Sequence, residues 1–134
     1  MSKTFVLIHG SWHGGWAWQG VERQLSKKGH RAQAPTLPGH GPGAMRLGVA
    51  HQDCVRGVVS YIQEQRLENV ILVGHSFGGS VIQKVAEEIP SLVERTVFLE
   101  VLIVEDGHCV FDELPAEYVA LFSDLARASS DNAC

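Results

Sequence analysis

The chain of 134 residues lacks several features that define large classes of proteins. Its three cysteines, Cys54, Cys109 and Cys134, are widely spaced and form no CxxC pair, which argues against a disulfide framework or a zinc site and predicts reduced thiols. With a net charge of −4 and no Lys/Arg cluster, the chain lacks the electrostatic footprint of nucleic-acid binding. No apolar run is long enough to cross a bilayer, so we expect no membrane span.

Short apolar runs alternate with amphipathic segments along the chain. The first run follows Met1 closely and ends in His-Gly, whereas a signal peptide would end at a cleavage site of small residues. We therefore interpret this run as a strand and expect a cytoplasmic protein. The patterns predict strands at residues 4–8, 30–37, 69–73 and 95–104, and helices at residues 16–28, 49–65, 80–88 and 112–128. This alternation predicts right-handed βαβ crossovers, and therefore an α/β fold with a parallel sheet and helices on both faces. The length corresponds to a single domain over residues 1–134.

The segment Gly74-His75-Ser76-Phe77-Gly78 follows a predicted buried strand and precedes a predicted helix. In that context the pattern G-x-S-x-G is typical of a nucleophile elbow, in which small neighbours relieve a strained turn and expose the serine hydroxyl. The N-terminus of the following helix favours negative charge, so the N–H of Phe77 is the first candidate donor to an oxyanion. The alternative is a tight glycine turn without chemistry.

A second oxyanion donor is expected from the glycine-rich loop after the first strand. In this loop the backbone N–H of Ser11 is the candidate. His9, before Gly10, and His75 flank glycines in the two key loops, and we expect them to support these loops by hydrogen bonds. We expect Trp12, Trp16 and Trp18 to pack around the first loop, with a stacking platform for a ligand as the alternative, and we interpret His13, His30, His40 and His51 as loop or surface residues.

Five segments together resemble the α/β-hydrolase superfamily, and within it the small esterase and hydroxynitrile-lyase group, over about residues 4–111: FVLIHGSWHGGWAW, APTLPGHG, HQDCVRGVVSYI, VILVGHSFGG and VFLEVLIVEDGH. The resemblance implies a truncated α/β-hydrolase fold with the spatial strand order second, first, third, fourth. It also implies that Ser76 is the nucleophile, that Ser11 and Phe77 form the oxyanion hole, and that residues 105–134 begin the lid.

The resemblance further implies a triad acid and a histidine later in the family's chain, and this sequence contains neither. A serine without a base is a poor nucleophile at neutral pH. Glu100 and His108 are the candidate substitutes, because they keep the order Ser, Glu, His along the chain.

These observations favour a carboxylesterase-type serine hydrolase that acts on small esters without a cofactor or a metal. Two alternatives remain. One is a catalytically weak or inactive hydrolase fold that serves as a binding or interaction module. The other is a hydroxynitrile-lyase-like enzyme, in which the hydroxyl of Ser11 binds the substrate oxygen. The apolar strand at residues 95–104 is expected at the sheet edge, which predicts a homo-oligomer formed through this edge.

Overall fold

The computed structural model describes residues 1–101 and 103–108. The predicted helix at residues 112–128, most of the predicted lid segment, Cys109 and Cys134 lie outside the described residues. The elements are β1 (Thr4–Ile8), a 3-10 helix η1 (Gly15–Trp18), α1 (Gln19–Lys27), β2 (Arg31–Gln33), α2 (His51–Glu64), β3 (Val70–His75), α3 (Phe77–Glu88), a 3-10 helix η2 (Pro90–Leu92) and β4 (Val93–Leu99). They alternate as predicted.

The four strands form one parallel sheet in the order β2-β1-β3-β4, which confirms the expected topology. Thr4 of β1 pairs with Val70 of β3, and the register continues to Ile8 opposite Gly74. The two central strands therefore end side by side, and the loops that follow them meet at the same edge of the sheet. In open α/β sheets this carboxyl edge is where ligands bind.

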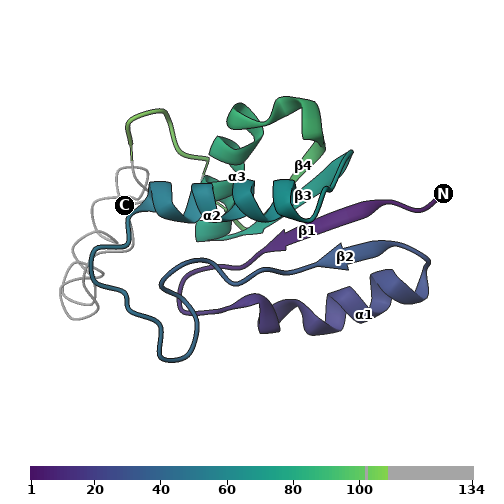
Figure 1. Cartoon of the computed structure of the whole chain (residues 1–134), viewed down its shortest axis with the longest axis horizontal. Helices are drawn as coiled ribbons and strands as arrows, with labels where there is room; N and C mark the ends of the chain where they lie inside the picture. The colour runs from purple at the N-terminus through teal and green to yellow at the C-terminus, as the bar shows by residue number, and fades with distance from the viewer. Residues whose placement is uncertain (102, 109–134) are drawn as a thin grey trace.

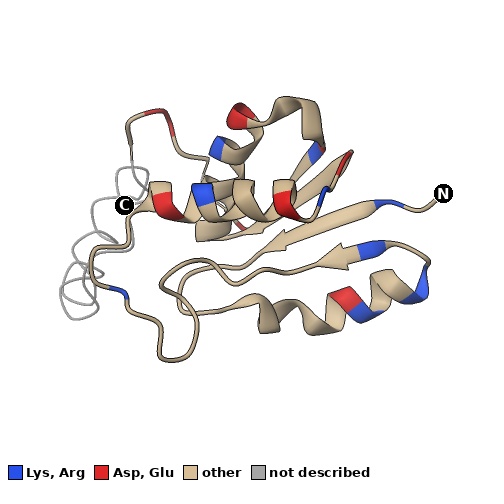
Figure 2. Ribbon diagram, in the orientation of Figure 1, with Lys and Arg blue, Asp and Glu red and all other residues tan. Residues whose placement is uncertain are grey.

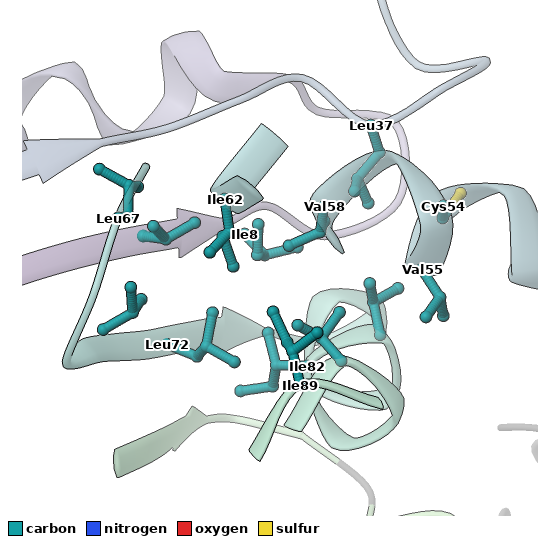
Figure 3. Packing of buried hydrophobic residues seen from close by; sticks show 14 of the residues in the cluster. Ile8, Leu37, Cys54, Val55, Val58, Ile62, Leu67, Leu72, Ile82 and Ile89 are labelled. Atoms are coloured by element: carbon teal, nitrogen blue, oxygen red, sulfur yellow. The ribbon is translucent and has the colours of Figure 1, made fainter. Parts of the chain in front are cut away.

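Helices cover both faces of the sheet, as the alternating pattern predicted (Figure 1). On one face, α2 and α3 pack against β1 and β3, and Figure 3 shows Ile8, Leu72, Val55 and Ile82 converging in this larger core. On the other face, Trp18 and Leu25 pack against a smaller cluster of Leu7, Ile71 and Val73. The central strands are thus buried on both sides, which is why their sequences read as continuous apolar runs.

Two strands are shorter than predicted. The strand expected at residues 95–104 ends at Leu99, because Glu100 takes a left-handed conformation with φ 48° that cannot continue a strand. Beyond it, Val101 packs on Gly79 of α3, and the side-chain amide of Gln83 both donates to the carbonyl of Val104 and accepts its N–H, each at 3.3 Å. The second half of the apolar run therefore lies along α3 and not at the sheet edge.

The strand expected at residues 30–37 pairs with β1 only over Arg31–Gln33. After Gln33 the chain turns toward the loop that follows β1. A Cβ at Gly15 would lie 1.9 Å from the carbonyl oxygen of Ala34, and the N–H of Leu37 donates to the His9 ring at 2.9 Å. These tertiary contacts draw residues 34–37 out of the sheet and bring two loops together at its carboxyl edge.

Candidate active site

Ser76 is the junction between β3 and α3 and is exposed. Its backbone has φ 52° and ψ −121°, a region that residues with a side chain rarely enter and that costs about 1–3 kcal/mol. Within the described residues its hydroxyl makes no hydrogen bond, and it does not cap α3. The fold thus holds a serine in a strained conformation and leaves its oxygen open to a ligand.

The glycines around Ser76 stand where no side chain fits. A Cβ at Gly74 would lie 2.7 Å from the carbonyl oxygen of Gly78, and a Cβ at Gly78 would lie 2.6 Å from the carbonyl oxygen of Ile8. A Cβ at Gly10 would lie 3.2 Å from the Cβ of Ser76. The elbow and the loop after β1 are therefore packed backbone against backbone, and the loop lies directly beside the serine.

The N-terminus of α3 supplies the electrostatics expected of an oxyanion site. Phe77 is the first residue of this helix, so its N–H has no partner within the helix. No acidic residue lies in the first turn to offset the partial positive charge of the helix end. The carbonyl of Ser76 accepts the N–H of Gly79 at 2.9 Å, which holds the Ser76–Phe77 peptide in one orientation.

His9 is buried, with 1% of its surface exposed, and it makes hydrogen bonds through both ring nitrogens. Nδ1 lies 2.8 Å from the carbonyl oxygen of Gly10, and Nε2 accepts the N–H of Leu37 at 2.9 Å. Burial lowers the pKa of His9, and the nearby His40 and His13 act in the same direction, while the bond to Gly10 opposes them. The ring is held neutral between the two loops.

The ring of Phe77 is enclosed by histidines that the sequence interpretation treated as loop or surface residues. His40 stacks on it at 5.8 Å between ring centroids, and His51 meets it edge-on at 5.7 Å. His51 Nε2 lies 3.1 Å from the hydroxyl of Ser80, which donates to the Phe77 carbonyl at 2.7 Å. Burial, followed by the charge of Lys84, lowers the pKa of His51.

A sequence signal for His51 was available. Val55, Val58 and Ile62 follow it at spacings of four, three and four residues, so His51 continues the apolar stripe of α2 that faces the core.

Glu100 and His108, the candidate acid and base, are 24 and 32 positions after Ser76 and form no relay with its hydroxyl in the described residues. The carboxylate of Glu100 is 3.9 Å from Nε2 of His75, and both side chains are solvent-accessible. His108 is exposed at the end of a turn, where its N–H donates to the carbonyl of Glu105 at 3.0 Å. The structure therefore brings Glu100 to His75 and not to the hydroxyl of Ser76.

The loops around the elbow expose large apolar side chains. Trp12 is 69% exposed and Trp16 is 55% exposed, but the Trp16 ring still packs on His13 of the first loop, with ring centroids 5.5 Å apart, and Trp18 packs in the smaller core. Trp12 also has a left-handed backbone with φ 60°. Met45 and Leu47, in the loop that follows β2, are exposed as well. Figure 2 shows that the loops after β1 and β2 carry almost no charge.

Residues 1–101 and 103–108 contain neither a cluster of metal-ligating side chains nor a membrane-spanning helix. No group of three or more His, Cys, Asp or Glu side chains in this part of the chain could hold a metal ion. No helix in the same part is long and apolar enough to span a membrane.

Comparison with known proteins agrees with this geometry. The sequence model of the Alpha/beta hydrolase family matches residues 5–128. The carbendazim hydrolyzing esterase of Nocardioides sp. (strain SG-4G) is 41% identical over 114 residues, covering 84% of this chain and 47% of that protein. Salicylic acid-binding protein 2 of Nicotiana tabacum is 31% identical over 109 residues, covering 79% of this chain and 42% of that protein. An extracellular alpha/beta-hydrolase from a Paenibacillus species superposes with a TM-score of 0.89 at 42% identity, covering 95% of this chain and 52% of that chain.

The chain belongs to the alpha/beta hydrolase family. Its relatives in this comparison include an esterase and several methylesterases. The chain spans about half the length of the curated relatives it matches.

Proposed function

We propose that this chain carries the nucleophile and the oxyanion hole of a serine esterase for small carboxylic esters. The hydroxyl of Ser76 attacks the ester carbonyl, and the N–H groups of Ser11 and Phe77 hold the oxygen that becomes negatively charged. The single observation that carries the proposal is the backbone of Ser76, with φ 52° and ψ −121°, beside the Gly10 loop. A fold that needed only a tight turn would place glycine at this position.

The surroundings of the elbow favour an uncharged ester with an apolar group. Residues 9–18 contain no Lys, Arg, Asp or Glu, and residues 34–50 contain only Arg46. Trp12 and Trp16 offer exposed aromatic faces beside the candidate oxyanion donor. The relatives include a carbendazim hydrolyzing esterase and a pyrethroid hydrolase.

The base that activates Ser76 has two candidate sources. One is His108 of this chain, with Glu100 as its acid, which requires the segment after β4 to fold back over the elbow. The other is a histidine supplied from outside this sequence, because all seven histidines of the chain lie within the described residues and the chain spans only about half the length of its relatives. The first source predicts hydrolysis by the chain that His108→Ala abolishes, and the second predicts that the chain alone hydrolyses no ester.

The test is hydrolysis of a short-chain aryl ester by the chain, with Ser76→Ala as the nucleophile variant and Ser91→Ala, an exposed serine of η2, as the matched control. We expect turnover that Ser91→Ala retains and Ser76→Ala loses. Measurable turnover that is equal in all three proteins would overturn the proposal, and no turnover in any of them would leave only the second source of the base.

A binding module is the second candidate, and the observation that favours it is the absence of any hydrogen bond from the Ser76 hydroxyl to a base within the described residues. It predicts no turnover but saturable binding of a slowly hydrolysed ester analogue, weakened by Trp12→Ala.

The hydroxynitrile-lyase alternative predicts that the chain releases an aldehyde from a cyanohydrin and that this reaction depends on the Ser11 hydroxyl. Ser11→Ala separates the two enzymes, because the esterase uses the backbone N–H of residue 11 and keeps its activity in this variant.

We also propose that β4 pairs with a second copy of the chain. Among the described strands β4 pairs only with β3, and Leu99 at its end is 42% exposed. The exposed Glu94 and Arg95 restrict which strand can pair with this edge, since charged side chains oppose strand addition unless they meet opposite charges. Light scattering over a range of concentrations should show a dimer, and a monomer at the highest concentration would contradict the pairing.

A further inference from the structure

The two hydrogen bonds of His9 determine which of its nitrogens carries the proton. A backbone N–H can only donate, so the N–H of Leu37, 2.9 Å from Nε2, requires a lone pair on that nitrogen. The proton of the neutral ring must then be on Nδ1, where it faces the carbonyl oxygen of Gly10 at 2.8 Å, a group that can only accept. The surroundings thus specify one tautomer of a ring that is 1% exposed.

The carbonyl of Gly10 and the N–H of Ser11 belong to the same peptide unit. A trans peptide is planar, and its C=O and N–H point in opposite directions. A bond that holds the carbonyl oxygen on one side therefore also sets where the N–H points on the other. The N–H of His13 reaches the same carbonyl, but at 3.4 Å, so the shorter bond from His9 dominates.

The N–H of Phe77, the other candidate donor, is oriented in the same way. The N–H of Phe77 shares a peptide with the carbonyl of Ser76, and that carbonyl accepts the N–H of Gly79 at 2.9 Å. Each of the two candidate N–H donors thus belongs to a peptide whose carbonyl accepts a hydrogen bond. For Phe77 the bond comes from the helix backbone, whereas for Ser11 it comes from a side chain.

We propose that His9 is a positioning residue: its neutral Nδ1–H tautomer fixes the Gly10–Ser11 peptide and thereby aims the N–H of Ser11 at the developing oxyanion. The inference rests on the proposed function in that Ser11 is a donor only if Ser76 attacks a carbonyl. A second proton on the ring would turn Nε2 into a donor facing the N–H of Leu37 and would break that bond. The neighbouring His40, with ring centroids 5.2 Å apart, and His13 both oppose this proton.

Two substitutions separate the two bonds of the ring. In His9→Asn the side-chain amide nitrogen stands near the position of Nδ1 and can still donate to Gly10. In His9→Gln the amide oxygen reaches the position of Nε2 and can accept from Leu37, but the donor to Gly10 is lost. His30→Gln is the matched control, because Nδ1 of His30 also accepts a backbone N–H, that of Lys3 at 3.1 Å, at the opposite edge of the sheet.

With the aryl ester we expect His9→Gln to lower kcat by about 10–100-fold with little change in KM. An oxyanion-hole donor raises kcat by about 10²–10³-fold, and a misdirected donor loses part of this rate enhancement. His9→Asn and His30→Gln should keep kcat within a few-fold of the original. A purely structural role for His9 predicts instead that Asn and Gln lose kcat equally and in step with their melting temperatures, and this result would overturn the proposal.

Nuclear magnetic resonance tests the same inference without turnover. We expect a scalar coupling across the hydrogen bond between the Leu37 amide nitrogen and Nε2 of His9, and a Ser11 amide resonance that shifts in His9→Gln but not in His9→Asn. If the chain hydrolyses no ester, the proposed function fails while this measurement still decides the role of His9. A protonated Nε2, or a Ser11 resonance that is the same in both variants, refutes it.

Discussion

Replacing Ser76 with glycine should make the protein more stable. The conformation at φ 52° and ψ −121° costs a residue with a side chain about 1–3 kcal/mol, and glycine adopts it without that cost. Glycine gives back about 0.4–1 kcal/mol, because it gains freedom in the unfolded chain. Nothing else is lost, since the Ser76 side chain is exposed and makes no hydrogen bond within the described residues.

The net expectation for Ser76→Gly is a gain of about 1 kcal/mol in the free energy of unfolding, or about 4 °C in melting temperature for a chain of this size. Ser76→Ala keeps a Cβ and the strain with it, so its stability should stay near that of the original protein. Ser60→Gly is the matched control: Ser60 is exposed in the middle of α2, where glycine costs about 0.5 kcal/mol relative to serine.

Urea denaturation of the four proteins measures these differences. The predicted order of stability is Ser76→Gly first, then the original chain and Ser76→Ala together, then Ser60→Gly. If Ser76→Gly loses stability as Ser60→Gly does, the serine is not strained, and the argument from its backbone to a nucleophile elbow is refuted.

Four other properties follow from the structure. Gly78→Ala should lower the free energy of unfolding by about 3 kcal/mol, because its Cβ would lie 2.6 Å and 2.7 Å from backbone oxygens of Ile8 and His9. Gly20→Ala, whose Cβ would meet nothing within 4 Å, should be neutral or stabilising. Equal free energies of unfolding for the two variants in urea would contradict this prediction. The pKa values of His9 and His51 lie below 6.5 in the folded protein, so the unfolded chain binds protons first as the pH falls below 6.5. The free energy of unfolding should therefore decline from about pH 6.5 until the folded pKa values are reached. Melting temperatures that stay constant from about pH 7.5 to pH 5 would count against this prediction. Burial raises the pKa of the Cys54 thiol to about 11, so in a Cys109→Ser/Cys134→Ser background a thiol reagent at about pH 8 should react only after unfolding, and rapid labelling of the native protein would refute this. Trp12→Ala should raise KM for an aryl ester more than for a methyl ester of acetate, and an equal change for both would remove Trp12 from the substrate site.

The sequence was sufficient for the central strands and the elbow, because their signals are local. Residues 4–8 are a continuous apolar run, and β1 occupies the same residues. Ser76 stands in a pentapeptide whose glycines reveal the turn. The end of β4 could not be predicted, because the apolar pattern runs on past Glu100 and the turn there depends on contacts with Gly79 and Gln83 of α3.

The hydrogen-bond partners of His9 and His51 could not be predicted from the sequence either. His9 and Leu37 are 28 positions apart, and His51 and Ser80 are 29 apart, so neither pair leaves a periodic or motif-level trace. The exposure of Trp12 and Trp16 was also missed, since aromatic residues near a glycine-rich loop serve equally well as packing or as a binding surface. In each case the sequence pattern does not show which distant residue lies beside the side chain in the folded protein.

The central claim is that Ser76 is a nucleophile held ready by the fold. Its most direct test is the site of reaction with a fluorophosphonate, located by peptide mass spectrometry in the native chain, in the urea-unfolded chain and in Ser76→Ala. The account predicts one adduct, on Ser76, in the native chain alone. No adduct at Ser76, or equal labelling of the native and unfolded chains, would contradict it.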